Sequence, residues 1–62
     1  EEINFVVQIN GKKRAILKVN RDITEYQVLE KIKTNKEIQK NFEGQKIKRS
    51  IFIPNKLINI II

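Results

Sequence analysis

The chain has 62 residues, and thirteen Lys or Arg against seven Asp or Glu give it a formal net charge of +6 at pH 7. Cysteine and histidine are absent, which excludes disulfides, thiolate or imidazole metal sites, and Ser-His or Cys-His catalysis. No run reaches the roughly 20 apolar residues of a membrane-spanning helix. The excess of basic charge points to a polyanionic partner, with charge for solubility alone as the alternative.

The N-terminal residue bears on whether these residues belong to a longer chain. The chain begins with Glu1 and contains no methionine, although initiator methionine is rarely removed ahead of a bulky acidic residue. We therefore expect residues 1–62 to be a single domain excised from a longer chain, with Ile62 as the natural end. The lack of cysteine and of a signal-peptide pattern is consistent with a cytoplasmic location and no membrane partner.

Residues 3–19 are predicted to form a β-hairpin. Apolar side chains occupy the odd positions from Ile3 to Ile9, and this period of two is typical of a half-buried strand. Asn10-Gly11 then predicts a type I′ turn, which requires positive φ at both central residues. Residues 12–19 form the second strand, in which alternation predicts that Lys12 and Arg14 share one surface while Lys13 faces the other. Its inward face would carry Ala15, Leu17 and Val19.

A first helix is predicted over residues 25–33. Thr24 is a favoured N-cap residue, and Gln27 three positions later completes a capping box. A narrow apolar stripe at helical spacing follows, formed by Val28, Leu29 and Ile32.

A second, shorter helix is predicted over residues 34–42. Thr34 and Glu37 repeat the capping-box spacing, and Gly44 suits the left-handed position that often follows a helix. The break at Thr34-Asn35 is soft, so the two helices could also be continuous.

Two strands, 47–53 and 57–62, are predicted to end the chain, joined by a turn at Pro54-Asn55-Lys56. Alternation places Ile51 and Ile53 on the apolar face of the first strand and Phe52 on the other. In the last strand Ile58, Ile60 and Ile62 share a face. The element order is β-β-α-(α)-β-β, and the expected fold is α+β: one small four-stranded sheet with helices packed on one face.

No catalytic site is expected within these residues. The two glycines cannot form a P-loop or a dinucleotide-binding fingerprint. The carboxylates are scattered at helix starts and surfaces, where caps, helix-dipole partners and ion pairs are expected. We therefore predict no catalytic residue, no metal ligand and no cofactor in this segment.

The basic residues are better grouped, in two runs and at one turn. Their functional interpretation is contact with phosphates, which fixes position without reading sequence, and the structural alternative is protection of strand edges against aggregation. Tyr26 and Phe52 could stack on a base, but in so small a domain we expect both in the core. The candidates for RNA binding are Lys12, Lys13, Arg14, Lys46, Lys48, Arg49 and Lys56.

Three strings and their spacing carry a resemblance. They are VVQINGKKRAILKV at 6–19, ITEYQVLEKI at 23–32 and IQKNFEGQKIKRSIFIPNKLINIII at 38–62. Together they resemble the C-terminal domain of bacterial-type leucyl-tRNA synthetases, which has an early VNGK-x-RG pattern and ends in V-x-V-P-x-K-L-V-N-I-V-V. Ala15 and Asn55 depart from this pattern, because the family usually has glycine at the first position and often at the second.

The resemblance implies a parent class I ligase that charges tRNA with leucine and uses ATP and magnesium elsewhere in its chain. It implies that this domain contacts the elbow and the long variable arm of leucine tRNA. The implied partners are leucine tRNA and the rest of the synthetase, with no DNA. Lys12 and Arg14 match the family's basic turn and are the first candidates for RNA contact.

The alternative is a small β-grasp-like protein-interaction module that docks through a sheet edge or apolar outer residues. Its patch would use the side chains predicted on the less buried faces, which are Val6, Ile16, Phe52 and Ile61. An apolar patch would bind independently of salt, unlike a phosphate site. A stand-alone nucleic-acid-binding protein is less favoured, because the initiator methionine is missing.

Overall fold

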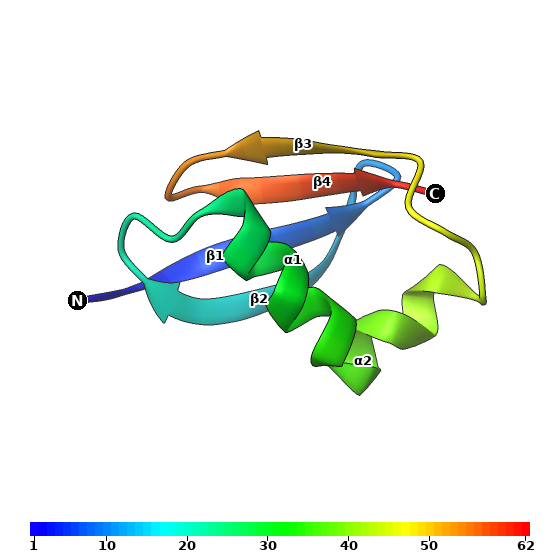
Figure 1. The fold of residues 1–62 in the computed structure, drawn as a ribbon, viewed down its shortest axis with the longest axis horizontal. Helices are drawn as coiled ribbons and strands as arrows, with labels where there is room; N and C mark the ends of the chain where they lie inside the picture. Colours follow the sequence, from blue (N-terminus) through cyan, green and yellow to red (C-terminus); the bar gives the residue numbers. More distant parts are fainter.

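A computed structural model describes all 62 residues and shows a four-stranded sheet with helices on one face (Figure 1). The strand order is β2-β1-β4-β3, with β1 parallel to β4 and the other two pairs antiparallel. The predicted α+β class and element order are confirmed. The elements are β1 (Glu2–Ile9), β2 (Lys12–Asn20), α1 (Glu25–Thr34), α2 (Lys36–Gln39), the 3-10 helix η1 (Lys40–Phe42), β3 (Arg49–Ile53) and β4 (Leu57–Ile61).

The core lies between the helices and the inner face of the sheet. Every buried residue is apolar, and the chain has no cysteine that could form a disulfide. The predicted inward faces of the first hairpin and of the last strand are confirmed, since these strands contribute more than half of the buried set. Its members are Phe5, Val7, Ile9, Val19, Ile23, Val28, Ile32, Ile38, Phe42, Ile58 and Ile60.

The turn between β1 and β2 has the predicted conformation, with φ of 54° at Asn10 and 84° at Gly11. A β-bulge then interrupts the ladder, because Val7 pairs with Ala15 but Gln8 pairs with Lys13. Arg14 is the extra residue. The strict alternation that predicted a shared surface for Lys12 and Arg14 therefore does not run through this part of β2.

Helix α1 begins with the predicted capping box. The backbone N–H of Gln27 donates to Thr24 Oγ1 over 3.2 Å, and the backbone N–H of Thr24 donates to Gln27 Oε1 over 3.1 Å. The two bonds satisfy backbone donors that the first turn of a helix leaves free. Val28 and Ile32, on the predicted apolar stripe, are fully buried.

The second helical segment is separate from α1 and begins later than predicted. The Thr34 hydroxyl donates back to the carbonyl oxygens of Glu30 and Lys31, both over 3.2 Å, so Thr34 ends α1 instead of capping the next helix. Asn35 is the N-cap of α2, since its Oδ1 accepts from Ile38 N over 3.1 Å. The segment predicted as one helix is a single α-turn followed by η1.

Strand β3 differs from the prediction in its start and in its faces. It begins at Arg49, two residues after the predicted start at 47. Ile51 and Ile53, predicted on the apolar face, are 42% and 39% exposed, whereas Phe52 turns inward against the core. The predicted faces of this strand were therefore wrong.

Contacts with other elements explain the orientation of β3. The rings of Phe52 and Phe5 stack with their centroids 5.7 Å apart, and Phe52 lies opposite the buried Ile58 in the ladder. On the same face, the Ser50 hydroxyl donates to Glu25 Oε2 at the start of α1 over 2.7 Å. A slip of one residue exchanges the two faces of a strand, so pairing with β4 decides which alternate set is inward.

The turn between β3 and β4 contains Asn55 with φ of 60°, the left-handed conformation expected from the sequence. Asn55 also joins two loops that are far apart in the chain. Its Oδ1 accepts from Asp22 N over 2.7 Å, and its Nδ2 donates to Asp22 Oδ1 over 2.9 Å. None of the helices has the length and apolar character needed to cross a membrane.

Candidate nucleic-acid interface

Six of the seven candidate RNA-binding residues lie at one end of the sheet. Strands β1 and β4 are parallel and end there, while β2 and β3 run against them and start there. Figure 1 shows the β1–β2 turn, the start of β3 and the C-terminus side by side at this end. We call it the basic end, and it is formed by Lys12, Lys13, Arg14, Lys46, Lys48 and Arg49.

The ladder gives the width of the basic end. One row of paired residues crosses all four strands, from Lys12 through Ile9 and Ile60 to Ser50. Because neighbouring strands lie about 4.7–4.9 Å apart, the three intervals put the backbones of Lys12 and Ser50 roughly 15 Å apart. Arg49 directly precedes Ser50. The two basic runs therefore flank a surface wide enough to contact several phosphates of a nucleic acid.

The cations of the basic end are not neutralised within the chain. All six side chains are exposed. The only ion pairs lie elsewhere, between Arg21 and Glu1 at 3.9 Å and between Lys40 and Glu37 at 3.5 Å. An uncompensated group of cations produces a positive potential that attracts a polyanion and speeds its association.

Side-chain amides fix the backbone of the basic end to β4. Asn59 Oδ1 accepts from Gly11 N over 2.9 Å, and Asn10 Oδ1 accepts from Ile62 N over 3.0 Å. On the other side, Lys48 N donates to the carbonyl oxygen of Ile61 over 2.7 Å. The role of Asn59 was not predicted, although a lone polar residue within an apolar strand was the available signal.

Lys56 is separated from the other candidates. It lies in the turn that joins the end of β3 to the start of β4, which is the opposite end of the sheet. Asp22 lies in the loop that Asn55 bonds at this same end. Lys56 therefore shares no surface with the basic end.

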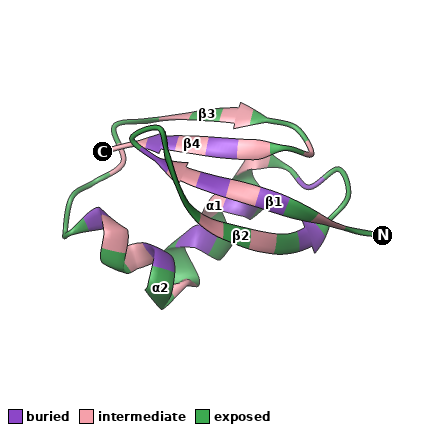
Figure 2. Ribbon diagram, turned by 180° about the vertical axis from the view of Figure 1, so that it is seen from behind, coloured by how far each residue is buried: buried purple, intermediate pink, exposed green.

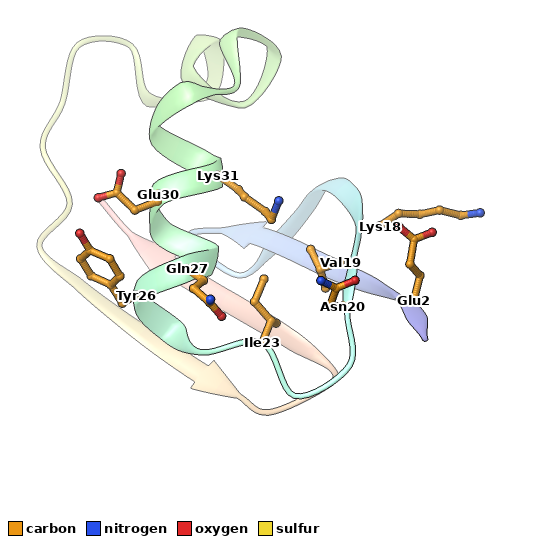
Figure 3. A pocket seen from close by; sticks show the side chains of 9 residues that line it. All are labelled: Glu2, Lys18, Val19, Asn20, Ile23, Tyr26, Gln27, Glu30 and Lys31. Carbon is orange, nitrogen blue, oxygen red and sulfur yellow. The ribbon is translucent and has the colours of Figure 1, made fainter.

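The two aromatic residues considered for base stacking, Phe52 and Tyr26, lie in different environments. Phe52 packs against the core, as expected for an aromatic residue in a small domain but contrary to the face that alternation gave it. Tyr26 is 72% exposed on α1, so the expectation that it is buried was wrong. Tyr26 borders an open pocket of about 470 Å³ between α1 and the end of β2. Figure 3 shows Gln27 and Lys31 on the side of α1 toward β2, and Tyr26 on its other side.

This pocket does not extend the basic end. Its charged lining consists of two carboxylates and two ammonium groups, so it has no net charge to attract phosphate. No three carboxylates approach one another closely enough to hold a metal ion. The charged lining residues are Glu2, Lys18, Glu30 and Lys31.

Figure 2 is viewed toward the outer face of the sheet, opposite the helices. The strand pairing places an apolar row on this face. Its four residues pair with one another across all four strands, and two of them, Ile16 and Ile53, are 51% and 39% exposed. Val6 and Ile16 lie on this face as predicted, whereas Phe52 does not belong to it. The row consists of Ile16, Val6, Leu57 and Ile53.

Known proteins resemble this chain over its full length. No family model matches it. It is 39% identical over 62 residues to the leucine–tRNA ligase of Buchnera aphidicola subsp. Cinara cedri and covers 7% of that protein. The leucine–tRNA ligase of Petrotoga mobilis is 40% identical over 62 residues, of which the chain covers 8%, and that of Protochlamydia amoebophila is 42% identical over 60 residues. The chain thus spans less than a tenth of the length of these curated relatives.

A solved structure has the same fold. It is the ternary complex of an Agrobacterium radiobacter K84 LeuRS with tRNA and LeuAMS, which matches 98% of this chain with a TM-score of 0.88 and 26% identity. The matched region is 8% of that synthetase chain.

Proposed function

Because the chain is homologous over its whole length to a segment of leucine–tRNA ligases, we propose that it is the C-terminal tRNA-binding domain of such an enzyme. In this proposal the domain contacts the elbow and the long variable arm of leucine tRNA and positions the tRNA for aminoacylation. The parent enzyme is cytoplasmic and binds ATP and magnesium in another part of its chain. This segment contributes no catalytic residue.

The observation that carries the proposal is the basic end. Its six exposed cations have no ion-pair partner within the chain, and the two basic runs adjoin strands β2 and β3, whose backbones lie roughly 15 Å apart at this end. Structured RNA is recognised mainly through its shape, its phosphates and its 2′-hydroxyls, which suits a basic surface without a stacking platform. Lys12 and Arg14 are the first candidates for phosphate contact, followed by Lys13, Lys46, Lys48 and Arg49.

The proposal also uses the tRNA in the solved relative. That synthetase was crystallised with tRNA, and its matched region shares the fold of this chain. We extend tRNA contact to the present domain, and the rest of the synthetase is its second proposed partner.

The test compares two triple variants that each remove three positive charges. The first changes Lys12, Arg14 and Lys48 of the basic end to Gln. The matched control changes Lys18, Arg21 and Lys56, which are exposed and lie away from that end. The weak, exposed Arg21–Glu1 pair contributes little to stability, so both variants should fold alike.

Binding of each protein to leucine tRNA is measured at several salt concentrations, with a tRNA that lacks a long variable arm as comparison. Each lost phosphate contact flattens the slope of log affinity against log salt by about 0.7–0.9, so the first variant should flatten it by as much as about 2–3. The control should keep nearly the wild-type slope. Equal losses in both variants, or no loss in either, would reject the basic end as the interface.

The apolar row on the outer face favours a second candidate, a protein-docking module. A row of four apolar residues on an uncovered sheet face is suited to contact with protein, including the rest of the synthetase. Such binding would survive high salt and would be weakened by Ile16→Ser but not by the triple variant of the basic end. Binding through the apolar row and binding through the basic end therefore differ in their salt dependence and in the variant that weakens them.

A further inference from the structure

We propose that Asn10 is a latent deamidation site and that Asn59 protects it. Asn10 is followed by Gly11, and glycine has no side chain to hinder the approach of its backbone nitrogen to the neighbouring amide carbon. Both residues are exposed, so water reaches them. This chemistry concerns the lifetime of the chain and goes beyond tRNA binding.

The reaction needs only water. The backbone nitrogen of Gly11 loses its proton and attacks Cγ of Asn10, forming a C–N bond that closes a five-membered imide. The bond between Cγ and Nδ2 breaks, and Nδ2 leaves as ammonia with the proton. Water then opens the ring at one of its two carbonyl groups. The products are aspartate or isoaspartate at position 10, so the net change is hydrolysis of one amide to a carboxylic acid and ammonia.

Two hydrogen bonds restrain the reacting groups. The nucleophile is held because the N–H of Gly11 donates to Asn59 Oδ1 over 2.9 Å. The amide under attack is held because Asn10 Oδ1 accepts from Ile62 N over 3.0 Å. Ring closure requires Gly11 to give up its proton and Asn10 to rotate, so both bonds must break first. Asn59 belongs to β4 and lies 48 residues from Gly11 in the chain. Its protection of Asn10 is therefore lost when the sheet opens.

Aspartate or isoaspartate at position 10 would change the charge and the backbone of the basic end. Position 10 lies between the two basic runs, and deamidation adds a carboxylate there. Isoaspartate also lengthens the backbone, which is incompatible with the type I′ turn at Asn10 and Gly11. If the proposed function holds, the modified chain binds tRNA more weakly; the deamidation itself is independent of that function.

The test follows the mass and isoaspartate content of the peptide containing Asn10 during incubation at mildly alkaline pH. Asn59→Ala removes the acceptor of the Gly11 N–H, whereas Asn59→Asp keeps an acceptor oxygen. Gln8→Ala is the matched control, because Gln8 pairs with Asn59 in the ladder and makes no side-chain hydrogen bond to the turn. Wild-type chain unfolded in urea gives the unprotected rate.

The folded wild type should react more slowly than the unfolded chain. Asn59→Ala should react about two to twelve times faster than the wild type, the factor that corresponds to the net worth of one hydrogen bond. Asn59→Asp and Gln8→Ala should stay near the wild-type rate. Equal rates for Asn59→Ala and the wild type would overturn the proposal, and so would a folded wild type that reacts as fast as the unfolded one.

If Asn59→Ala fails to fold, hydrogen exchange in the wild type tests whether Asn59 protects the Gly11 amide. Hydrogen exchange of the Gly11 amide should be slowed relative to its unprotected rate, because its proton is bonded to Asn59. Exchange at the unprotected rate would remove the physical basis of the protection. None of these assays contains RNA, so their failure is distinguishable from failure of the proposed tRNA binding.

Discussion

Replacing Phe52 should destabilise the domain far more than replacing its neighbour Ile51. Phe52 packs inward and stacks on the fully buried Phe5, whereas Ile51 faces solvent with 42% of its surface exposed. The alternation of the sequence suggests the reverse, so the pair Phe52→Ala and Ile51→Ala separates the two orientations of β3.

The magnitudes follow from burial. A fully buried Phe→Ala change costs about 3–5 kcal/mol of unfolding free energy, and an aromatic pair contributes about 0.5–1.5 kcal/mol beyond its buried area. Since Phe52 is only half-buried, we expect a loss of about 2–3 kcal/mol. Ile51→Ala removes exposed apolar surface and some β-propensity, which together cost about 1 kcal/mol or less. A domain of this size without disulfides has only about 3–5 kcal/mol of stability, so Phe52→Ala approaches the limit of folding.

Urea unfolding monitored by circular dichroism measures both losses. With a slope of about 1 kcal/mol per molar urea, the midpoint should fall by roughly 2–3 M for Phe52→Ala and by about 1 M or less for Ile51→Ala. An Ile51→Ala variant that loses as much stability as Phe52→Ala would refute the inward orientation of Phe52 and with it the register of β3 on β4.

Three further predictions test other parts of the structure. Asn35→Ala should cost about 1 kcal/mol in urea unfolding because it removes the N-cap of α2, whereas Thr34→Ala should change stability by less than about 0.5 kcal/mol. Lys56→Gln should leave the salt dependence of tRNA binding unchanged, because Lys56 lies at the opposite end of the sheet; a slope flattened by about one would contradict this. Asn55→Ala should cost about 1–3 kcal/mol, since it keeps the left-handed conformation but loses both bonds to Asp22, and Asn55→Gly should cost less because glycine adopts that conformation freely.

Local patterns predicted the parts of the fold that depend on neighbours in sequence. The alternation from Ile3 to Ile9, the turn at Asn10-Gly11 and the capping box of Thr24 and Gln27 each involve residues within one strand, turn or helix end, and all are confirmed. The resemblance to leucyl-tRNA synthetases is likewise confirmed by full-length homology to a segment of these enzymes.

Features set by distant pairing could not be read from the sequence. Alternation in β3 gives two complementary sets of residues but not which set is inward, and that choice depends on pairing with β4 and stacking on Phe5. Tyr26 was expected in the core because it is aromatic, but it lies on the exposed side of α1, outside the apolar stripe that buries Val28 and Ile32. The bulge at Arg14 was also invisible, because nothing in the local sequence marks the shift in pairing.

The candidate site shows the same division. The sequence marks two basic runs and one basic turn as equivalent clusters, because charge density is a local property. Only the parallel pairing of β1 with β4 brings the β1–β2 turn and the start of β3 to one end and leaves Lys56 at the other. The grouping of six candidates without the seventh is therefore a consequence of topology.

The hydrogen bond between the Gly11 N–H and Asn59 Oδ1 affects both the conformation of the basic end and its resistance to deamidation. A type I′ turn favours Asn-Gly because both residues take positive φ, and the same dipeptide permits imide formation. Replacing Gly11 with alanine would hinder that reaction but would strain the turn at φ of 84°. Removing the deamidation site in this way would therefore distort the surface that carries Lys12 to Arg14. The amide of Asn59 restrains the nucleophile while leaving the turn unchanged. The hydrogen bond from the Gly11 N–H therefore explains why the apolar strand β4 contains the polar residue Asn59. This bond leaves the type I′ turn unchanged and opposes the deamidation that the Asn-Gly sequence of the turn permits.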